Sequence, residues 1–348
     1  MIISLDKISK HDTLFLKGLA ICGMLIWHIF WCPNPQGIIF SPFIRYIGAI
    51  GDVCVSIFLF ISGYGLTIGF QKKGEIKPTA FILSRLLKFY SNFWFVFILI
   101  VLFGTIFMNQ PIYVEGTWLN KIIQFGKEFF AIRGQSSYND SWWYFSLIIS
   151  LYILYPLLFW GIKKAPFFVI LVTILCNSFT FRLIGQNIQL YIPIFIVGII
   201  WAMHGNKIPI ISLFKLTILA IILIVLSLVI LIFIYDIKSI SQIGIPLYGI
   251  LTIGLTFMVL SLQKRNNLII RIFCFIGHYA TNIYIVHMMF SKYWFSDLFY
   301  GLKYPWMIFL ALLIASLLFS VFVDFIKEIS GYNKIFNRLQ LRINDIIK

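Results

Sequence analysis

The sequence predicts an all-α polytopic integral membrane bundle of about ten transmembrane helices, with both termini in the cytoplasm. Three observations indicate this fold class. The 348 residues are 61% hydrophobic and 11% charged, with a mean hydropathy of +0.95, which leaves too little polar surface for a water-soluble globule. The apolar runs are roughly 17 to 25 residues long, the length at which a helix crosses a bilayer. Basic residues gather in alternate loops, as expected of a multi-pass protein.

The predicted spans follow one another along the whole chain, at about residues 14–31, 46–70, 89–108, 142–161, 166–181, 188–203, 213–235, 243–262, 272–290 and 305–326. The longest connection is expected to hold a helix that lies along the headgroups, because Trp118, Ile122, Phe125 and Phe129 recur at near-helical spacing. The residues after 326 are interpreted as a polar tail. No segment outside the spans is long enough to fold alone, so 1–348 is expected to be one transmembrane domain with no appended soluble domain.

The placement of the basic residues orients this bundle. Of the 28 Lys and Arg residues, 19 fall on one side of the ten-span topology and 8 on the other, while Lys17 lies inside the first span. The richer side is predicted to face the cytoplasm and anionic lipid. The net charge of +16 does not indicate nucleic-acid binding, because no soluble basic domain or arm exists to carry it. The five cysteines show neither a disulfide pattern nor metal-ligand spacing, so no metal is expected.

The first span contains two ionisable residues, Lys17 near its start and His28 near its end. Eleven positions make about three helical turns, so both side chains share one face and lie ~16 Å apart along the axis. Ionisable residues inside a span are costly and usually face a bundle interior or a wet cavity. The alternative is that Lys17 snorkels to the headgroups and His28 only bonds a neighbouring helix.

Four more polar residues are predicted at the depth of His28 in the outer half of the bundle. Asp52 and Ser56 open the second span, and Tyr284 and His287 share one face of the ninth. These side chains are expected to converge on one site. The alternatives are a helix-packing hydrogen bond for His287 and a helix-end position for Asp52.

Two groups lie toward the inner side. Ser62, Gly63 and Tyr64 end the second span, where small residues serve either close helix packing or ligand passage. Arg85 and Lys88 lie one helical turn apart at the start of the third span. They are either ordinary cytoplasmic charge or a clamp for a multiply charged ligand such as phosphate.

Together these motifs resemble the acyltransferase 3 family of membrane O-acyltransferases over nearly the full length of the chain. The family's first-span signature, a basic residue and a His separated by ten residues, matches Lys17 and His28, although Arg is the commoner basic residue. Its second-span Ser-Gly-aromatic pattern matches residues 62–64. Its Arg-x-x-Arg appears as Arg85 and Lys88, a second Arg-to-Lys departure.

Two later segments extend the resemblance. WWYFSLIISLYILYP, which includes Trp143, resembles the family's fourth-span region. GHYATNIYIVH resembles its late Gly-x-x-Ser-x-x-x-Tyr-x-x-His segment, with Tyr284 and His287 in place but without Ser at its usual position. Many relatives carry an acid where Ser56 stands, so if Asp52 orients the first-span His, it does so from a different place.

The resemblance implies transfer of an acyl group, usually acetyl, from cytoplasmic acyl-CoA to a hydroxyl of a cell-surface polysaccharide or lipid-linked sugar. The residues expected to serve this reaction are, as catalytic groups, His28 and Lys17; as acyl-CoA-binding groups, Arg85, Lys88, Ser62, Gly63 and Tyr64; and, in support, Asp52, Ser56, Trp143, Tyr284 and His287. The donor substrate is acetyl-CoA or another acyl-CoA. The expected location is the cytoplasmic membrane of a bacterium; the sequence does not indicate the oligomeric state.

The main alternative is a multispan carrier or flippase for a lipid-linked sugar, since buried His and Lys residues also serve transport. A carrier is expected to show broken spans in two matching halves, and no such internal symmetry is visible. A glycosyltransferase or polymerase is expected to pair acidic residues in a large outer loop, and no recognisable pair exists.

Overall fold

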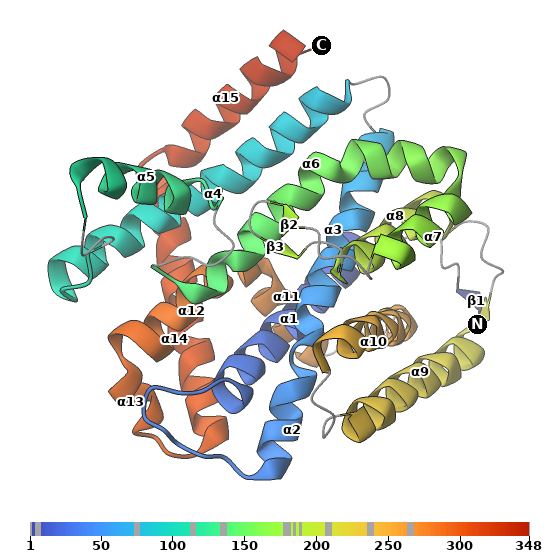
Figure 1. Ribbon diagram of the computed structural model, residues 1–348, viewed down its shortest axis with the longest axis horizontal. Helices are drawn as coiled ribbons and strands as arrows, with labels where there is room; N and C mark the ends of the chain where they lie inside the picture. Colours follow the sequence, from blue (N-terminus) through green and yellow to red (C-terminus); the bar gives the residue numbers. More distant parts are fainter. Residues whose placement is uncertain are drawn as a thin grey trace.

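The computed structural model of the protein is built almost entirely from helices (Figure 1). It describes residues 2–3, 8–72, 77–111, 116–132, 138–176, 182–183, 186–187, 190–205, 211–234, 240–262 and 268–347. The elements are, in chain order, β1 (Ile2–Ile3), α1 (Lys10–Ile26), η1 (Trp27–Trp31), α2 (Pro42–Ile50), α3 (Val53–Lys72), α4 (Pro78–Phe107), α5 (Trp118–Phe129), η2 (Asp140–Trp142), α6 (Trp143–Lys164), α7 (Pro166–Cys176), β2 (Arg182–Leu183), β3 (Gln186–Asn187), α8 (Ile192–His204), β4 (Ile211–Ser212), α9 (Leu213–Ile234), α10 (Ile240–Leu262), α11 (Leu268–His278), α12 (Ala280–Met288), η5 (Met289–Trp294), α13 (Ser296–Tyr300), α14 (Pro305–Ile329) and α15 (Tyr332–Ile347). The two-residue strands pair antiparallel, β1 with β4 and β2 with β3.

The predicted all-α membrane bundle is confirmed, but the predicted count of ten spans is not. Within the described residues, six helical stretches are long and apolar enough to cross a membrane, and a bent pair, α11 with α12 and η5, makes a seventh if it is counted as one span. Each of the other predicted spans holds a helix, but α7 and α8 run for only 11 and 13 residues.

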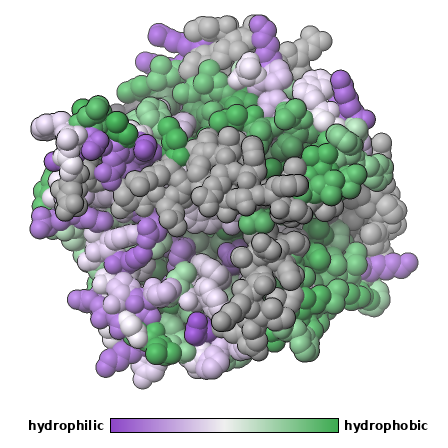
Figure 2. All heavy atoms as spheres, viewed as in Figure 1, coloured by the Kyte–Doolittle hydropathy of each residue, from purple (hydrophilic) through white to green (hydrophobic). Residues whose placement is uncertain are grey.

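Large apolar side chains on the outer surface of the bundle support a lipid environment. Phe214 and Phe233 of α9 are 74% and 77% exposed. Figure 2 shows broad apolar areas on the flank where Figure 1 places α9 and α10, while hydrophilic residues gather on the opposite flank. An apolar surface of this extent is unstable in water and stable against acyl chains.

Helix α1 lies at the centre of the bundle. Ser9 caps its N-terminus in a capping box with Asp12, and the helix packs against α3 and α11 and also contacts α10, α12 and α14. Helices α1 and α11 approach each other closely because each contributes a glycine to the contact between them. A Cβ at Gly18 would overlap the Phe273 carbonyl oxygen, and one at Gly277 would overlap the Leu14 carbonyl oxygen. This packing holds α1, which carries Lys17 and continues directly into η1.

Two predicted spans are broken rather than continuous. The second span divides at Gly51 and Asp52 into α2 and α3. The ninth bends by 66° between α11 and α12 and ends in the π-helix η5. The first span also ends in a π-helix, η1. Because π-helical turns often occur at functional sites, the ends of these two spans are the first place to look for one.

The C-terminal segment, predicted as a polar tail, is instead the 16-residue helix α15, and that prediction was wrong. Gly331 adopts a positive φ of 69° after α14, a turn that suits glycine, and the chain then runs back along α4. Figure 1 shows α15 and α4 side by side. The predicted amphipathic helix is present as α5, with Trp118 80% exposed; its position at the headgroups stays a prediction.

Candidate active site

Two imidazoles lie against each other in a tilted arrangement near the ends of the first and ninth predicted spans. The ring centroids of His28 and His287 are 4.8 Å apart, with 50° between the ring planes. His28 belongs to η1 and is half-buried, whereas His287 belongs to α12, directly before η5, and is fully buried. The structure therefore brings together the two histidines that the sequence placed at matched depth.

The hydrogen bonding of His287 fixes which nitrogen carries its proton. Nδ1 lies 2.8 Å from the Tyr284 carbonyl oxygen. A carbonyl oxygen can only accept, so Nδ1–H donates, and the neutral ring presents a lone pair on Nε2. Nε2 is buried and has no hydrogen-bond partner in the described part of the chain. A buried lone pair beside a second imidazole is suited to accept a proton or to attack an electrophile.

The backbone around Tyr284 and His287 is held by residues at the start of α6. The Tyr284 hydroxyl donates to the Ser141 carbonyl oxygen. Asn139 Nδ2 and Trp142 Nε1 both donate to the Ile285 carbonyl oxygen, at 3.2 and 3.0 Å. Three side-chain bonds thus tie α12 to the η2 turn.

Charged groups near the imidazoles form an ion pair with each other. Lys292 Nζ lies 2.5 Å from Asp140 Oδ2, and the charges of both residues act on His28. The pKa of Cys32 is raised to about 12 by burial and by the charge of Asp52. Its thiol is therefore protonated at neutral pH and is a poor nucleophile. Imidazole is the reactive group that this region offers.

Three residues predicted to support the site lie outside the imidazole pair. Asp52 is half-buried at the α2–α3 break, and Ser56 is buried on α3, and neither makes a hydrogen bond to His28 or His287 within the described ranges. Trp143 packs against Tyr191, with the ring centroids 5.8 Å apart. Their proposed supporting roles stay predictions.

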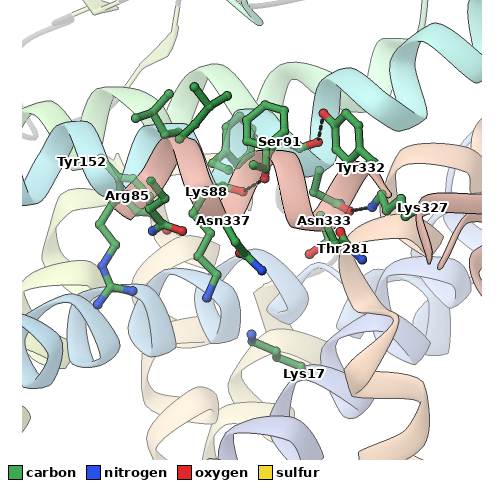
Figure 3. Close-up of a pocket in the computed structure, with 16 residues that line it drawn as sticks. Lys17, Arg85, Lys88, Ser91, Tyr152, Thr281, Lys327, Tyr332, Asn333 and Asn337 are labelled. Atoms are coloured by element: carbon green, nitrogen blue, oxygen red, sulfur yellow. Dashed lines mark hydrogen bonds between the residues drawn. The ribbon is translucent and has the colours of Figure 1, made fainter. Parts of the chain in front are cut away.

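A cavity of about 610 Å³ lies at the other end of α1 (Figure 3). Figure 3 shows the Arg85 and Lys88 side chains extending from α4 into it, with Lys17 pointing toward them from α1. The described residues that line it include no Asp or Glu; they are Lys17, Arg85, Leu87, Lys88, Phe89, Ser91, Asn92, Tyr152, Thr281, Lys327, Tyr332, Asn333, Phe336, Asn337, Leu339 and Gln340. Four cations and no carboxylate make this a cavity for an anion.

The Arg85 guanidinium is placed by a gap in the facing helix. Gly69 of α3 leaves that gap, since a Cβ there would overlap a terminal nitrogen of Arg85. Arg85 Cζ also lies 5.0 Å from the centre of the Phe81 ring. The guanidinium is thus held between α3 and α4 without a carboxylate partner within the described ranges, which leaves its charge for a ligand.

A row of hydroxyl and aromatic side chains connects the cavity with the imidazole pair. Tyr152 lines the cavity, and the Ser62 hydroxyl lies close enough to the hydroxyl groups of Tyr152 and Tyr144 to interact with both. The Tyr144 ring lies 5.5 Å from the Tyr284 ring, which lies 5.8 Å from the His287 ring. We call Tyr152, Ser62, Tyr144 and Tyr284 the polar seam. It runs between the two ends of α1 inside the bundle.

The other two residues of the Ser-Gly-aromatic motif face away from the cavity. Gly63 lies against α8, where a Cβ would overlap the Phe195 carbonyl oxygen. The Tyr64 hydroxyl accepts from the Ile8 backbone N–H at 2.9 Å. Neither lines the cavity, so their predicted contact with acyl-CoA stays a prediction. The contacts in the structure give both residues a packing role.

The sequence analysis did not single out several residues of the cavity. Lys327 was counted only as cytoplasmic charge, Asn92 was not considered, and Asn333 and Asn337 belong to the segment interpreted as a tail. A signal for the tail was present, because Tyr332 and Phe336 recur at helical spacing. Within the described residues, no group of three His, Cys, Asp or Glu side chains stands close enough to hold a metal ion.

Comparison with known families identifies the protein class. A family model described as an acyltransferase domain, acyltransferase 3, matches residues 13–325, nearly the whole chain. The chain belongs to the acyltransferase 3 family. No curated protein and no solved structure gives a significant match. Membership of this family, with the apolar helices, makes the protein a multi-pass membrane acyltransferase.

The family match divides the residues of the cavity into two groups. The matched region contains both imidazoles, the polar seam and the cations of α1 and α4. Lys327, near the end of α14, and all of α15 lie beyond residue 325, where the match ends. The cavity is therefore lined by α1 and α4 within the matched region, and by Lys327 and α15 beyond it.

Proposed function

We propose that this acyltransferase moves an acetyl or other short acyl group from cytoplasmic acyl-CoA to a hydroxyl of a cell-surface polysaccharide or lipid-linked sugar. The observation that carries the proposal is the position of both ends of α1. Lys17 lines a cationic cavity, and His28 lies against His287 ~16 Å further along the axis. One helix thus connects an anion site with a buried proton acceptor. The expected location is the cytoplasmic membrane of a bacterium.

The donor fits the cavity through its charge. Acyl-CoA carries several phosphate groups, and Lys17, Arg85 and Lys88 approach the cavity from two helices with no carboxylate among its described lining residues. The slim pantetheine arm is long and polar enough to follow the polar seam from Tyr152 toward Tyr284. The thioester then reaches the imidazole pair while the phosphates stay at the inner end.

The reaction at the imidazole pair is an acyl transfer whose atoms balance. The acceptor hydroxyl gives its proton to an imidazole and its oxygen bonds to the thioester carbonyl carbon. The C–S bond then breaks, and the imidazolium returns the proton to the departing CoA thiolate. His28, on the half-buried side, is the proposed base or transient acyl acceptor, and His287 supports its charge. Such acid–base catalysis contributes about 10²- to 10⁴-fold.

The experiment that tests this proposal measures thiol release. Purified protein in nanodiscs is given acetyl-CoA and a glycan acceptor, and free CoA is followed with a thiol reagent. His28→Ala is expected to lower turnover by about 10²-fold or more, because it removes the proton acceptor. His278→Ala is the matched control, since His278 is an exposed histidine at the end of α11 and is expected to leave turnover unchanged.

Two outcomes would contradict the proposal. Normal turnover in His28→Ala would remove the assigned base. Wild-type protein that binds a lipid-linked sugar and moves it across the bilayer without consuming acetyl-CoA would instead identify a carrier. Mass spectrometry of surface glycans made with and without the protein then names the acceptor, through a mass difference of one acyl group.

A further inference from the structure

Lys327 is the cation in the cavity that the family motifs do not explain. Its side chain is 5% exposed and lies near the end of α14. Within the described residues, Nζ makes one hydrogen bond, to Asn92 Oδ1, and contacts the Phe95 ring, and no carboxylate lies within ion-pair distance. The Asp324 carboxylate acts on Lys327 only from beyond ion-pair distance, and a buried ammonium group without a counter-ion in contact is costly. An anionic ligand in the cavity would supply the missing charge.

The side-chain amide of Asn92, which accepts a hydrogen bond from Lys327, is held in one orientation by Asn282. Asn92 Nδ2 donates to Asn282 Oδ1 at 2.9 Å, so Asn92 Oδ1 is the atom that faces the ammonium group. Lysine has three N–H donors, and this arrangement uses one of them. The other two remain for a ligand in the cavity that Lys327 lines. Figure 3 shows this bond at the end of the cavity away from Arg85.

Lys327 is separated from the cations of the motif along α4. Asn92 follows Lys88 by four residues and Arg85 by seven, which places it about 6 and 10 Å further along the helix axis. A single phosphate cannot contact both ends of this cavity. A ligand with two phosphate groups set apart from each other matches the spacing. CoA has this chemistry, with a diphosphate in its arm and a separate monophosphate on the ribose.

Helix α15 runs along the cavity from the Lys327 end to the Arg85 end and carries polar groups toward it. The Tyr332 hydroxyl donates to the Ser91 carbonyl oxygen at 2.8 Å, and Gln340 Nε2 donates to Ser84 Oγ at 3.3 Å, so α15 is fastened to α4 at two points. Burial raises the pKa of Tyr332 to about 12, which keeps its hydroxyl protonated as a donor. Asn333 and Asn337 line the cavity between these points without a hydrogen-bond partner among the described residues. Asn333 lies on the Lys327 side, and Asn337 lies beside Lys88 (Figure 3).

We propose that Lys327 and Asn333 form a second phosphate position, which binds the monophosphate at the nucleotide end of an acyl-CoA donor. This inference rests on the proposed function, because it names part of the same donor. Arg85 and Lys88 hold the diphosphate, and Lys327 with the Asn333 amide holds the monophosphate. The position distinguishes CoA from donors that lack this group, and it lies in the part of the chain beyond the family match.

The test compares two probes on four proteins. Dissociation constants of CoA and of dephospho-CoA, which lacks the ribose monophosphate, are measured by calorimetry on protein in nanodiscs. Wild type is expected to bind CoA about tenfold or more tightly than dephospho-CoA, the value of one charge-assisted contact. Lys327→Gln is expected to bring the ratio to within about twofold by weakening CoA alone. Arg85→Ala with Lys88→Ala is expected to weaken both probes and keep the ratio. Lys334→Gln, an exposed cation of α15 outside the cavity lining, is expected to keep both affinities.

Each outcome decides either this inference or the proposed function. Equal wild-type affinities, or an equal loss of both probes in Lys327→Gln, would overturn the second phosphate position while acyl-CoA binding stands. A wild-type protein that binds neither probe would overturn the proposed function itself. If thermal unfolding shows that Lys327→Gln does not fold, the variant Asn333→Ala decides. It is expected to lower the ratio several-fold, and an unchanged ratio would refute the position.

Discussion

The two ends of α1 differ in almost every physical property. At one end, His28 and His287 lie among aromatic rings, and the structure shows no charged group hydrogen-bonded to either ring among its described residues. At the other end, Lys17 borders an open cavity with cations from two further helices. The first environment holds a buried imidazole among aromatic rings, and the second gathers cations around a cavity. Under the proposed function, capture of the charged donor and proton transfer occur in separate places.

Such a separation has a physical advantage. Cations that bind phosphate must exchange with water, whereas a general base works best where solvent is excluded and its partner is preorganised. Placing Lys17 on α1 and His28 on η1, which continues α1 directly, keeps both conditions at a fixed spacing. The close packing at Gly18 and Gly277 then matters for function, because a shift of α1 moves both ends together.

The largest expected effect comes from changing His287 to Asn. The shorter amide can still donate to the Tyr284 carbonyl oxygen, as Nδ1 does, but the Nε2 lone pair is lost. Turnover is expected to fall by about 10²-fold or more, with the dissociation constant of CoA unchanged within about twofold. Turnover comes from thiol release and binding from calorimetry. Retention of full turnover would show that the Nε2 lone pair has no part in the reaction.

A smaller effect, on donor binding and not on turnover, is expected from Arg85→Ala with Lys88→Ala. The two cations act only on the charged donor, so CoA binding is expected to weaken by about 10- to 100-fold, while turnover at saturating donor is nearly kept. The affinity of wild type for CoA is expected to fall as the salt concentration rises. The residual affinity of the double variant for CoA is expected to depend less on salt. An unchanged KM for acyl-CoA would show that Arg85 and Lys88 do not bind the donor. It would also reject the assignment of donor binding and proton transfer to separate ends of α1.

Helical periodicity and depth predicted one contact of the candidate site. Spacing placed Lys17 and His28 on one face, and a separation of three placed Tyr284 with His287. Depth in the membrane then predicted that His28 and His287 lie together, which their 4.8 Å ring separation shows. The predicted convergence of Asp52 and Ser56 on the same site stays a prediction, because neither hydrogen-bonds to these rings within the described ranges.

Tertiary contacts without a periodic signal could not be predicted in the same way. A bias toward basic residues at cytoplasmic ends accounts for any lysine near a span end, so Lys327 could not be told from a headgroup contact. The polar seam depends on Ser62 of α3 reaching two tyrosines of α6, and neither partner is implied by the sequence around the other. The low average hydropathy of residues 332–347 concealed a helix that packs on α4.

The smallest expected effect tests how Arg85 is positioned at the inner end. Gly69→Ala adds a methyl group where the Arg85 guanidinium lies, and the flexible arginine can move aside without disturbing the helix backbone. CoA binding is expected to weaken about two- to fivefold, with the melting temperature nearly unchanged, because only the direction of one cation alters. Gly65→Ala, on the same helix with no atom near the added methyl, is the control and is expected to bind CoA as wild type does. If both alanine variants bind CoA equally well, the Arg85 charge acts from a distance and its exact placement against Gly69 has no role in binding.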